Sequence, residues 1–472
     1  MPDTAIRYLA RMTTTVPEAA APPIPKRRVA AWALWDAGSA GINAITTTFV
    51  FSTFLVSSYF YDPQLLAEKG KTAAEAALSA EYGLGTLVTG ILVALLAPAL
   101  GQLADARGRR KLWLGVCTAV TVVALVALFF TVGQPPFFLY GLIWFGVGTV
   151  FYEIATVNYH AMLAQVSTPK NIGRVSAIGW ASGYIAGIVL LLLVYVGLIA
   201  GSDPDVGGLL HVPTADGLNI RVVELVAAAW TLILSIPVIV AVPEAPREAS
   251  RERIGFLRAY VVLFRDIARL WITDRNTVLF LIASAVFRDG VTGVFQYGGI
   301  IAKGTFGFST GEVLIFGIAA NVVAGAATLS MGPLDDRLGP RRVMIISLSA
   351  LTILGLGIFF LHDAGQPVFW VGALLLSLFV GPAQSASRTF LTRVTPPERQ
   401  SEIFGLYATT GRAAIILAPA LFTAFIAWFG AQYWGMLGIV VVIAVGLALL
   451  LIFVKPPQAI RFATPQDENG PR

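Results

Sequence analysis

Long apolar segments recur along the chain, and short polar or charged connections separate each one from the next. A helix that crosses a bilayer needs roughly 20 mostly apolar residues, and about twelve segments reach that length. The predicted spans are 30–60, 79–103, 112–132, 137–158, 173–200, 221–242, 278–302, 311–333, 342–362, 368–390, 402–428 and 434–454. The pattern therefore predicts an all-α integral membrane protein with about 12 transmembrane helices.

Composition supports this fold class. The 472 residues are 56% hydrophobic and 13% charged, whereas soluble domains carry about 25% charged residues. So little polar surface argues against a cytosolic enzyme, a nucleic-acid binder or a secreted module. The single cysteine, Cys117, and three scattered histidines favour neither a disulfide framework nor a metal site. We expect no metal, no cofactor and no nucleic-acid partner.

Lysine and arginine gather in alternate connections, which indicates how the chain is oriented. Basic residues flank the spans at Lys26, Arg27, Arg28, Arg107, Arg109, Arg110, Lys111, Lys170, Arg174, Arg341, Arg342, Arg393, Arg399, Lys455 and Arg461. Connections near the cytoplasmic face of a membrane carry such an excess. We therefore expect a multi-pass protein of the cell (inner) membrane with both termini cytoplasmic. The formal net charge of +6 then reflects orientation rather than binding to nucleic acid.

A longer connection divides the chain after the sixth span. Arginines recur there every seven residues, and an apolar stripe accompanies them; the residues are Arg251, Arg258, Arg265 and Arg269, with Leu257, Val261, Phe264, Ala268 and Trp271. This pattern predicts a basic amphipathic helix at the inner membrane surface; a partly ordered, solvated linker is the alternative. The predicted regions are a disordered lead (1–25), an N-terminal six-helix bundle (26–242), the linker (243–277), a C-terminal six-helix bundle (278–455) and a cytoplasmic tail (456–472).

The two bundles repeat one loop motif. An aspartate, a glycine and a basic pair have the same spacing after the second and eighth spans: Asp105, Gly108, Arg110 and Lys111 match Asp336, Gly339, Arg341 and Arg342. Gly101 and Arg109 complete the first copy of the motif. We interpret the motif as a charged cytoplasmic latch that holds one conformation closed. The alternative is that these charges only set the topology. Two related six-helix halves are typical of secondary transporters, which bind substrate between the halves.

A second repeat places ionisable residues inside predicted spans. Trp35, Asp36, Ser39 and Asn43 in the first span match Arg288, Asp289, Thr292 and Gln296 in the seventh. A charge in the hydrocarbon core costs roughly 2.5–3.5 kcal/mol, so such residues are functional candidates. Their helical spacing predicts two polar stripes that face a central cavity. Either aspartate is a candidate proton carrier; a static ion pair is the alternative.

Other candidates for the substrate and proton pathway lie in three more spans. Arg412 lies near the middle of span 402–428 and either binds an anionic group of the substrate or neutralises Asp36 or Asp289. Glu153 either couples to protons or contacts the Arg109–Arg110 loop. Asn321 is a cavity candidate. Trp35 either stacks on substrate or packs between helices, and Glu224 is interpreted as an ordinary boundary residue.

The motif at 101–110, Gly-Gln-Leu-Ala-Asp-Ala-Arg-Gly-Arg-Arg, resembles the signature loop of the major facilitator superfamily. Segments 31–39, 171–180, 381–388 and 404–407 resemble the vacuole effluxer-like (autophagy-related) branch. This resemblance implies the major facilitator fold of two pseudo-symmetric six-helix bundles, and the fungal members imply amino-acid export. Span four lacks the Arg-x-x-x-Gly element and span five the Gly-Pro of drug/proton antiporters, which makes multidrug efflux less favoured.

We therefore expect a secondary active transporter that moves a small polar or zwitterionic, amino-acid-like solute by alternating access. Its expected partners are that solute, the lipid bilayer and coupling protons. The alternatives are an exporter of amphipathic or lipid-like compounds and a sensor or scaffold with a transporter fold. We do not expect this protein to be an enzyme, because the chain has no His-Glu-x-x-His or Gly-x-Ser-x-Gly motif.

The latch interpretation predicts that Asp105→Asn slows exchange between conformations without changing solute affinity, because the carboxylate would act in the loop and not in the binding site. Distance measurements between fluorophores on the two halves would report the exchange rate, and calorimetric titration would report the affinity. A changed affinity together with normal exchange would contradict the latch.

Overall fold

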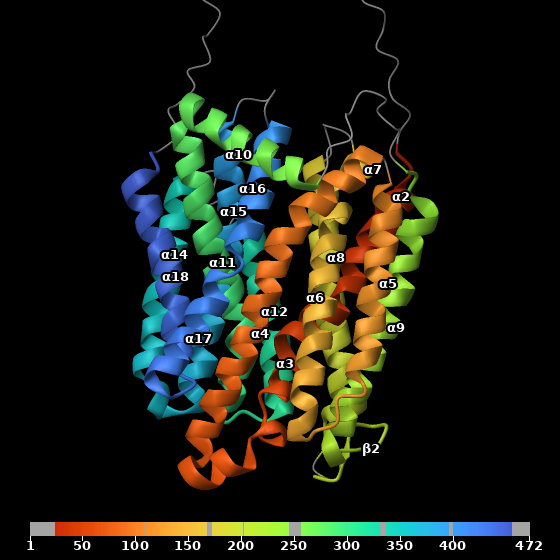
Figure 1. Ribbon diagram of the computed structural model, residues 1–472, viewed down its shortest axis with the longest axis vertical. Coiled ribbons are helices and arrows are strands. Elements are labelled where there is room, and N and C mark those ends of the chain that lie inside the picture. Colours follow the sequence, from red (N-terminus) through yellow and green to blue (C-terminus); the bar gives the residue numbers. More distant parts are fainter. Residues whose placement is uncertain are drawn as a thin grey trace, which may run out of the picture.

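The computed structural model describes residues 24–107, 109–167, 172–201, 203–244, 256–330, 337–395 and 400–455. Long helices run roughly along one axis and pack into a bundle, as Figure 1 shows. In the described part of the chain, eleven helices are long and apolar enough to cross a membrane. We call α2 to α9 the N half and α11 to α18 the C half.

Each predicted span coincides with helical structure. In the N half the elements are α2 (Lys26–Ala40), η1 (Gly41–Phe49), α3 (Phe51–Leu55), α4 (Pro63–Arg107), α5 (Arg110–Leu128), α6 (Phe138–Ala161), α7 (Leu163–Val166), α8 (Ile172–Val194), η4 (Tyr195–Ile199) and α9 (Leu218–Ala241). The only sheet among the described residues is a hairpin of β1 (Val206–Gly207) and β2 (Val212–Pro213), with Val206 opposite Pro213.

The C half follows a separate helix, α10 (Phe256–Thr273). Its elements are α11 (Arg275–Gly304), α12 (Thr310–Ser330), α14 (Pro340–Phe360), α15 (Gln366–Val394), α16 (Gln400–Ala414), α17 (Leu417–Phe429) and α18 (Trp434–Phe453). The predicted first span is not among the eleven, because it is divided into α2, η1 and α3. With that span included, the expectation of about 12 membrane helices is confirmed.

The first span is divided because its middle third, η1, is a π-helix. A π-helix pairs each N–H with the carbonyl five residues back, so it disturbs the bonding of carbonyls at its junctions. Side chains of α9 bind those carbonyls: Trp230 donates to Ala37 at 3.0 Å and Thr231 donates to Gly38 at 2.9 Å. Gly41 permits this close approach, because a Cβ there would collide with Thr231.

Basic side chains bind helix ends at one end of the bundle, the upper end in Figure 1. Arg110 donates to the carbonyl of Ala161 at 2.8 Å, and Arg341 donates to that of Val454 at 3.2 Å. The last carbonyls of a helix have no partner within the helix and carry partial negative charge, so a cation stabilises them. We call this the basic end.

The two halves close against each other at the opposite end. Gln432, between α17 and α18, donates to Ser79 of α4 at 2.9 Å, and both side chains are buried. Nearer the middle, the hydroxyls of Thr86 (α4) and Tyr297 (α11) lie 2.8 Å apart, and Tyr297 stacks on Phe422 with ring centroids 3.9 Å apart. The Gln432–Ser79 and Thr86–Tyr297 contacts hold the two halves together at this end, which we call the opposite end.

Candidate functional site

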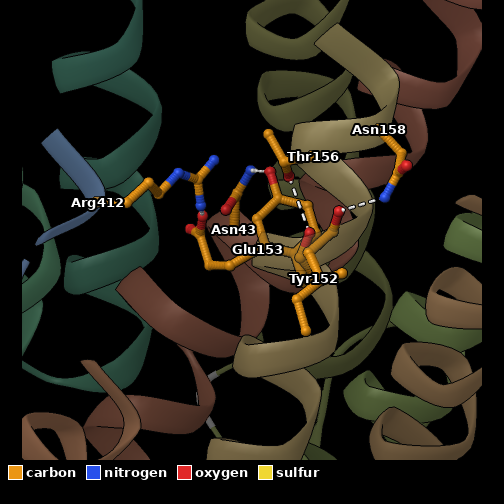
Figure 2. A network of polar contacts seen from close by, with 7 residues as sticks. Asn43, Tyr152, Glu153, Thr156, Asn158 and Arg412 are labelled. Atoms are coloured by element: carbon orange, nitrogen blue, oxygen red, sulfur yellow. Dashed lines mark hydrogen bonds and ion pairs between the residues drawn. The ribbon is translucent and has the colours of Figure 1, made fainter. Parts of the chain in front are cut away.

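An ion pair joins the two halves at the centre of the bundle. Glu153 of α6 and Arg412 of α16 point toward each other in Figure 2, and each side chain is 19% exposed. The structure thus corrects two expectations from the sequence: Glu153 pairs with Arg412 rather than with the Arg109–Arg110 loop, and Arg412 neutralises Glu153 rather than either aspartate. Arg110 lies at the end of α6, bound to Ala161.

The first polar stripe reaches Tyr152, the residue next to Glu153 in the ion pair. Asn43, on η1, donates to the hydroxyl of Tyr152 at 2.6 Å, and Tyr152 precedes Glu153 on α6 (Figure 2). Asn43 also lies 3.3 Å from Ser39, whose hydroxyl donates to the carbonyl of Asp36 at 2.7 Å. Asn43 is exposed even though it lies in the middle of the bundle. The predicted central cavity beside this stripe stays a prediction.

Asp36 lies in a narrow space between α2 and α8. A Cβ placed on Gly183 would come within 2.9 Å of its Oδ2 atom, so only glycine leaves room for the carboxyl group. The side chain is half-buried. Asp36 is therefore an ionisable residue inside a predicted span that is only partly buried, and its role as a proton carrier stays a prediction.

Asp289 has a different environment from its counterpart Asp36. It is buried, and its Oδ2 atom accepts a hydrogen bond of 2.6 Å from the backbone N–H of Ala418, in the first turn of α17. The predicted eleventh span is broken here into α16 and α17. The first N–H groups of a helix have no partner within it and favour a negative charge. Asp289 therefore binds the start of a half-helix.

The ion pair considered for Arg288 and Asp289 is not formed. Arg288 donates to the carbonyl of Tyr407 at 3.3 Å, and its guanidinium carbon lies 4.1 Å from the centroid of the Tyr407 ring. Neighbouring residues on a helix point about 100° apart, so the two side chains reach different parts of the eleventh span. Of the second stripe, Thr292 is exposed and Gln296 is half-buried.

The remaining pathway candidates have packing contacts. Trp35 is buried, donates to Thr118 at 3.1 Å and stacks on Tyr159, so in this conformation it packs within the N half. Asn321 is half-buried and donates to the carbonyl of Gly317 on its own helix at 2.8 Å. Their predicted contact with a substrate stays a prediction.

The two loop motifs lie partly outside the described residues. Gly108 and Asp336 are among those not described, and Gly101 and Asp105 lie in α4 without described side chains. Arg109 precedes α5, and Arg342 follows Arg341 in the first turn of α14. Gly339 has a φ of 81°, a value that glycine adopts without strain, and it leads into Pro340 at the start of α14. The latch therefore stays a prediction.

Glu224 is a residue whose position the sequence interpretation missed. It is fully buried in α9 and accepts a hydrogen bond of 2.9 Å from Thr46 of η1. Its other oxygen has no hydrogen-bond partner in the described part of the chain. The interpretation as an ordinary boundary residue is therefore wrong. The sequence does place Thr46 at a similar depth in the first span, which could have suggested a buried partner for Glu224. Sequence alone, however, does not show that α9 packs on η1.

An apolar cavity of about 70 Å³ lies in the C half beside η1. Phe49 of η1 lines it together with α11, α12, α14, α15 and α18, and Ser377 is the single polar side chain among its lining residues. Phe49 also packs against Gly317 of α12, so η1 contacts both halves.

Known proteins match this chain over most of its length. The family described as "Vacuole effluxer Atg22 like" matches residues 83–463. The "Uncharacterized MFS-type transporter YxiO" of Bacillus subtilis (strain 168) is 24% identical over 425 residues, which cover 89% of this chain and 93% of that protein. "Autophagy-related protein 22" of Cryptococcus neoformans var. neoformans serotype D is 23% identical over 266 residues, 52% of this chain and 44% of that relative.

A solved structure has the same fold. The D-xylose-proton symporter superposes with a TM-score of 0.64 at 16% identity, covering 92% of this chain and 98% of that one. At this identity the likeness establishes the fold alone. It confirms the expected major facilitator fold.

The position of Asp289 predicts different outcomes for two substitutions. Asp289→Asn keeps an oxygen that can accept from Ala418 and should retain most of the thermal stability, whereas Asp289→Ala should lose about 1 kcal/mol, as when a helix N-cap is removed. Thermal unfolding in detergent measures both. If Asp289 also carries protons, the Asn variant will lose proton-driven uptake although it folds. Equal destabilisation by both substitutions would contradict the capping role.

Proposed function

The chain belongs to the vacuole effluxer Atg22-like family, and on this premise we propose that it is a secondary transporter for a small polar or zwitterionic, amino-acid-like solute. The solute moves by alternating access and is coupled to protons. The proposed location is the cell (inner) membrane, with the basic end cytoplasmic because lysine and arginine concentrate on that side of a bilayer.

The observation that carries the proposal is the Glu153–Arg412 pair between the halves. A desolvated carboxylate or guanidinium is costly unless it is paired. A zwitterion can replace both partners at once, since its carboxylate binds Arg412 and its ammonium group binds Glu153. A solute with only one charge would leave one of the two residues without a partner. The pair therefore favours a zwitterionic solute that separates the halves when it binds.

Asp36 is the proposed proton carrier. It is half-buried, and hydrogen bonds through Ser39 and Asn43 link its backbone carbonyl to Tyr152, the residue that precedes Glu153 on α6. Protonation of Asp36 would remove a charge that is costly to bury inside the membrane. Proton binding and closure of the passage around Asp36 would therefore favour each other. Asp289 is less suited to this role, because the start of α17 already stabilises its negative charge.

Alternating access requires a second conformation in which the contacts at the opposite end separate. Those contacts include the hydrogen bonds between Gln432 and Ser79 and between Thr86 and Tyr297. These two hydrogen bonds are polar, so water or solute can replace them when the halves separate. The conformation described here is accordingly the one that is closed at the proposed outer side.

The apolar cavity supports a second candidate function, the export of amphipathic compounds. Its lining is almost entirely apolar, and Phe49 lies between it and the first polar stripe. A compound with a polar group at the ion pair and an apolar group in the cavity would use both sites. Gly298→Leu, which would fill the cavity, should abolish transport of such a compound and leave a small zwitterion unaffected.

Exchange of labelled amino acids by protein in liposomes would test the zwitterion proposal. Glu153→Gln and Arg412→Gln should each weaken solute binding by about 10- to 100-fold, because a hydrogen bond to a charged group contributes roughly 1.5–3 kcal/mol. Glu68→Gln is the matched control, since Glu68 is exposed. Unchanged binding in both variants, with an active wild-type protein, would exclude the pair from the solute site.

The proton carrier has a separate test. Asp36→Asn should still exchange labelled solute across liposomes, because exchange needs no net proton movement, but it should lose accumulation driven by a pH gradient. Asp205→Asn serves as the control, since Asp205 is exposed in the connection between α8 and α9. Gradient-driven accumulation by the Asp36→Asn protein would show that another group carries the proton.

A further inference from the structure

The helix α10 lies across the basic end instead of along the bundle axis (Figure 1). It leads into α11 through Asp274, whose carboxylate accepts hydrogen bonds from the backbone N–H and the hydroxyl of Thr277. A helix that crosses the ends of membrane spans runs parallel to the bilayer plane. α10 therefore lies at the depth of the lipid headgroups or just beyond them.

One face of α10 is bound to the protein. Leu270 is fully buried, and the hydroxyl of Tyr260 donates to the carbonyl of Leu95 on α4. The helix consequently contacts the N half through α4 and the C half through α11. These contacts determine which face is left uncovered, so the helix cannot rotate to bury its other side.

The uncovered face carries large apolar side chains. Val261, Phe264 and Ile272 are 63%, 66% and 85% exposed, and Ala268 lies between them on the same face. Spacings of three, four and seven residues place these side chains in one stripe. An exposed stripe of this kind at the membrane surface is typical of helices that insert an apolar face at the boundary between headgroups and acyl chains.

Arginines follow one edge of that stripe. Arg265 and Arg269 are both exposed and lie one turn apart, and Arg258 continues the same line toward the start of the helix. Asp266, the single acidic residue of α10, lies on the half-buried side. The uncovered face thus combines apolar side chains with positive charge alone, which complements a surface with apolar chains beneath negative phosphates.

We propose that this face of α10 docks on anionic phospholipid in the leaflet at the basic end. Val261, Phe264 and Ile272 enter the region beneath the headgroups, and Arg265 and Arg269 bind the phosphates and other anionic groups. Neutral phospholipid can accept the apolar stripe but gives the arginine edge no net charge to bind. The docking does not depend on which solute the protein carries.

Lipid binding can be measured on the full-length protein in nanodiscs. Phe264→Cys carries an environment-sensitive fluorophore; the single native cysteine, Cys117, is buried and does not compete. Discs made of phosphatidylcholine are compared with discs that also contain phosphatidylglycerol. We expect phosphatidylglycerol to shift the emission toward that of an apolar environment, and high salt to reverse part of the shift.

Removal of the arginine edge tests the charge selectivity. Each basic residue near an anionic surface contributes roughly fivefold to binding, so Arg265→Gln/Arg269→Gln should lower the preference for phosphatidylglycerol by about 25-fold. Arg27→Gln/Lys455→Gln is the matched control, because it removes two positive charges from the same end outside α10. Retained preference in the α10 variant, or equal loss in the control, would overturn the proposal.

The apolar stripe has its own variant. Val261→Ser/Ile272→Ser in the labelled protein should move the fluorophore emission toward that of a polar environment, both in phosphatidylcholine discs and in discs with phosphatidylglycerol. The protein should stay folded, as judged by its thermal unfolding. If the shift occurs in discs that hold two copies of the labelled protein and is lost in discs that hold one copy, a second copy covers the stripe instead. If the shift needs an added soluble protein, a protein partner covers it. Either result would also overturn the proposal.

Discussion

A charged side chain at membrane depth is stable only where another group compensates its charge, and this constraint explains the central part of the structure. Glu153 and Arg412 compensate each other, but they belong to different halves of the bundle. The pairing that stabilises each charge therefore also holds the halves together. Any motion that separates the halves leaves both charges without a partner unless something else binds them, and a charged solute can do so.

Backbone groups compensate several of the other charges described. Asp289 binds an N–H of α17, Arg288 binds the Tyr407 carbonyl, and Arg110 and Arg341 bind the ends of α6 and α18. The partners of Asp289, Arg110 and Arg341 are available because helices end or break beside these residues, whereas the Tyr407 carbonyl lies within α16. The break between α16 and α17 therefore stabilises the Asp289 carboxylate, because it leaves a backbone N–H free to bind it.

The spans, the linker helix and the repeat between the halves could be predicted from sequence, because each depends on the spacing of apolar and basic residues along the chain. The apolar stripe of α10, for example, follows directly from helical periodicity. The partners of Glu153, Asp289 and Glu224 could not be predicted in the same way. Each partner lies on a distant segment, and the match depends on how two helices are rotated against each other.

The repeat itself was partly misleading. It matches Asp36 with Asp289, but a match along the chain does not ensure equivalent environments. Asp36 lies beside Gly183 of a continuous α8, whereas Asp289 lies beside a broken helix. A pattern within one helix contains no information about a break in its neighbour. For this reason the half-buried and the helix-bound aspartate could be distinguished only in three dimensions.

The π-helical segment η1 has a mechanical consequence. It lies between Asp36 in α2 and Phe49, which packs on Gly317 of the C half. In each of its turns the hydrogen bond reaches one residue further along the chain than in an α-helical turn. Conversion of one such turn to α-helix would rotate the two ends of the first span against each other by about 100°, the angle between successive residues. A small change in backbone register could therefore act as a torsional joint between Asp36 and the opposing half.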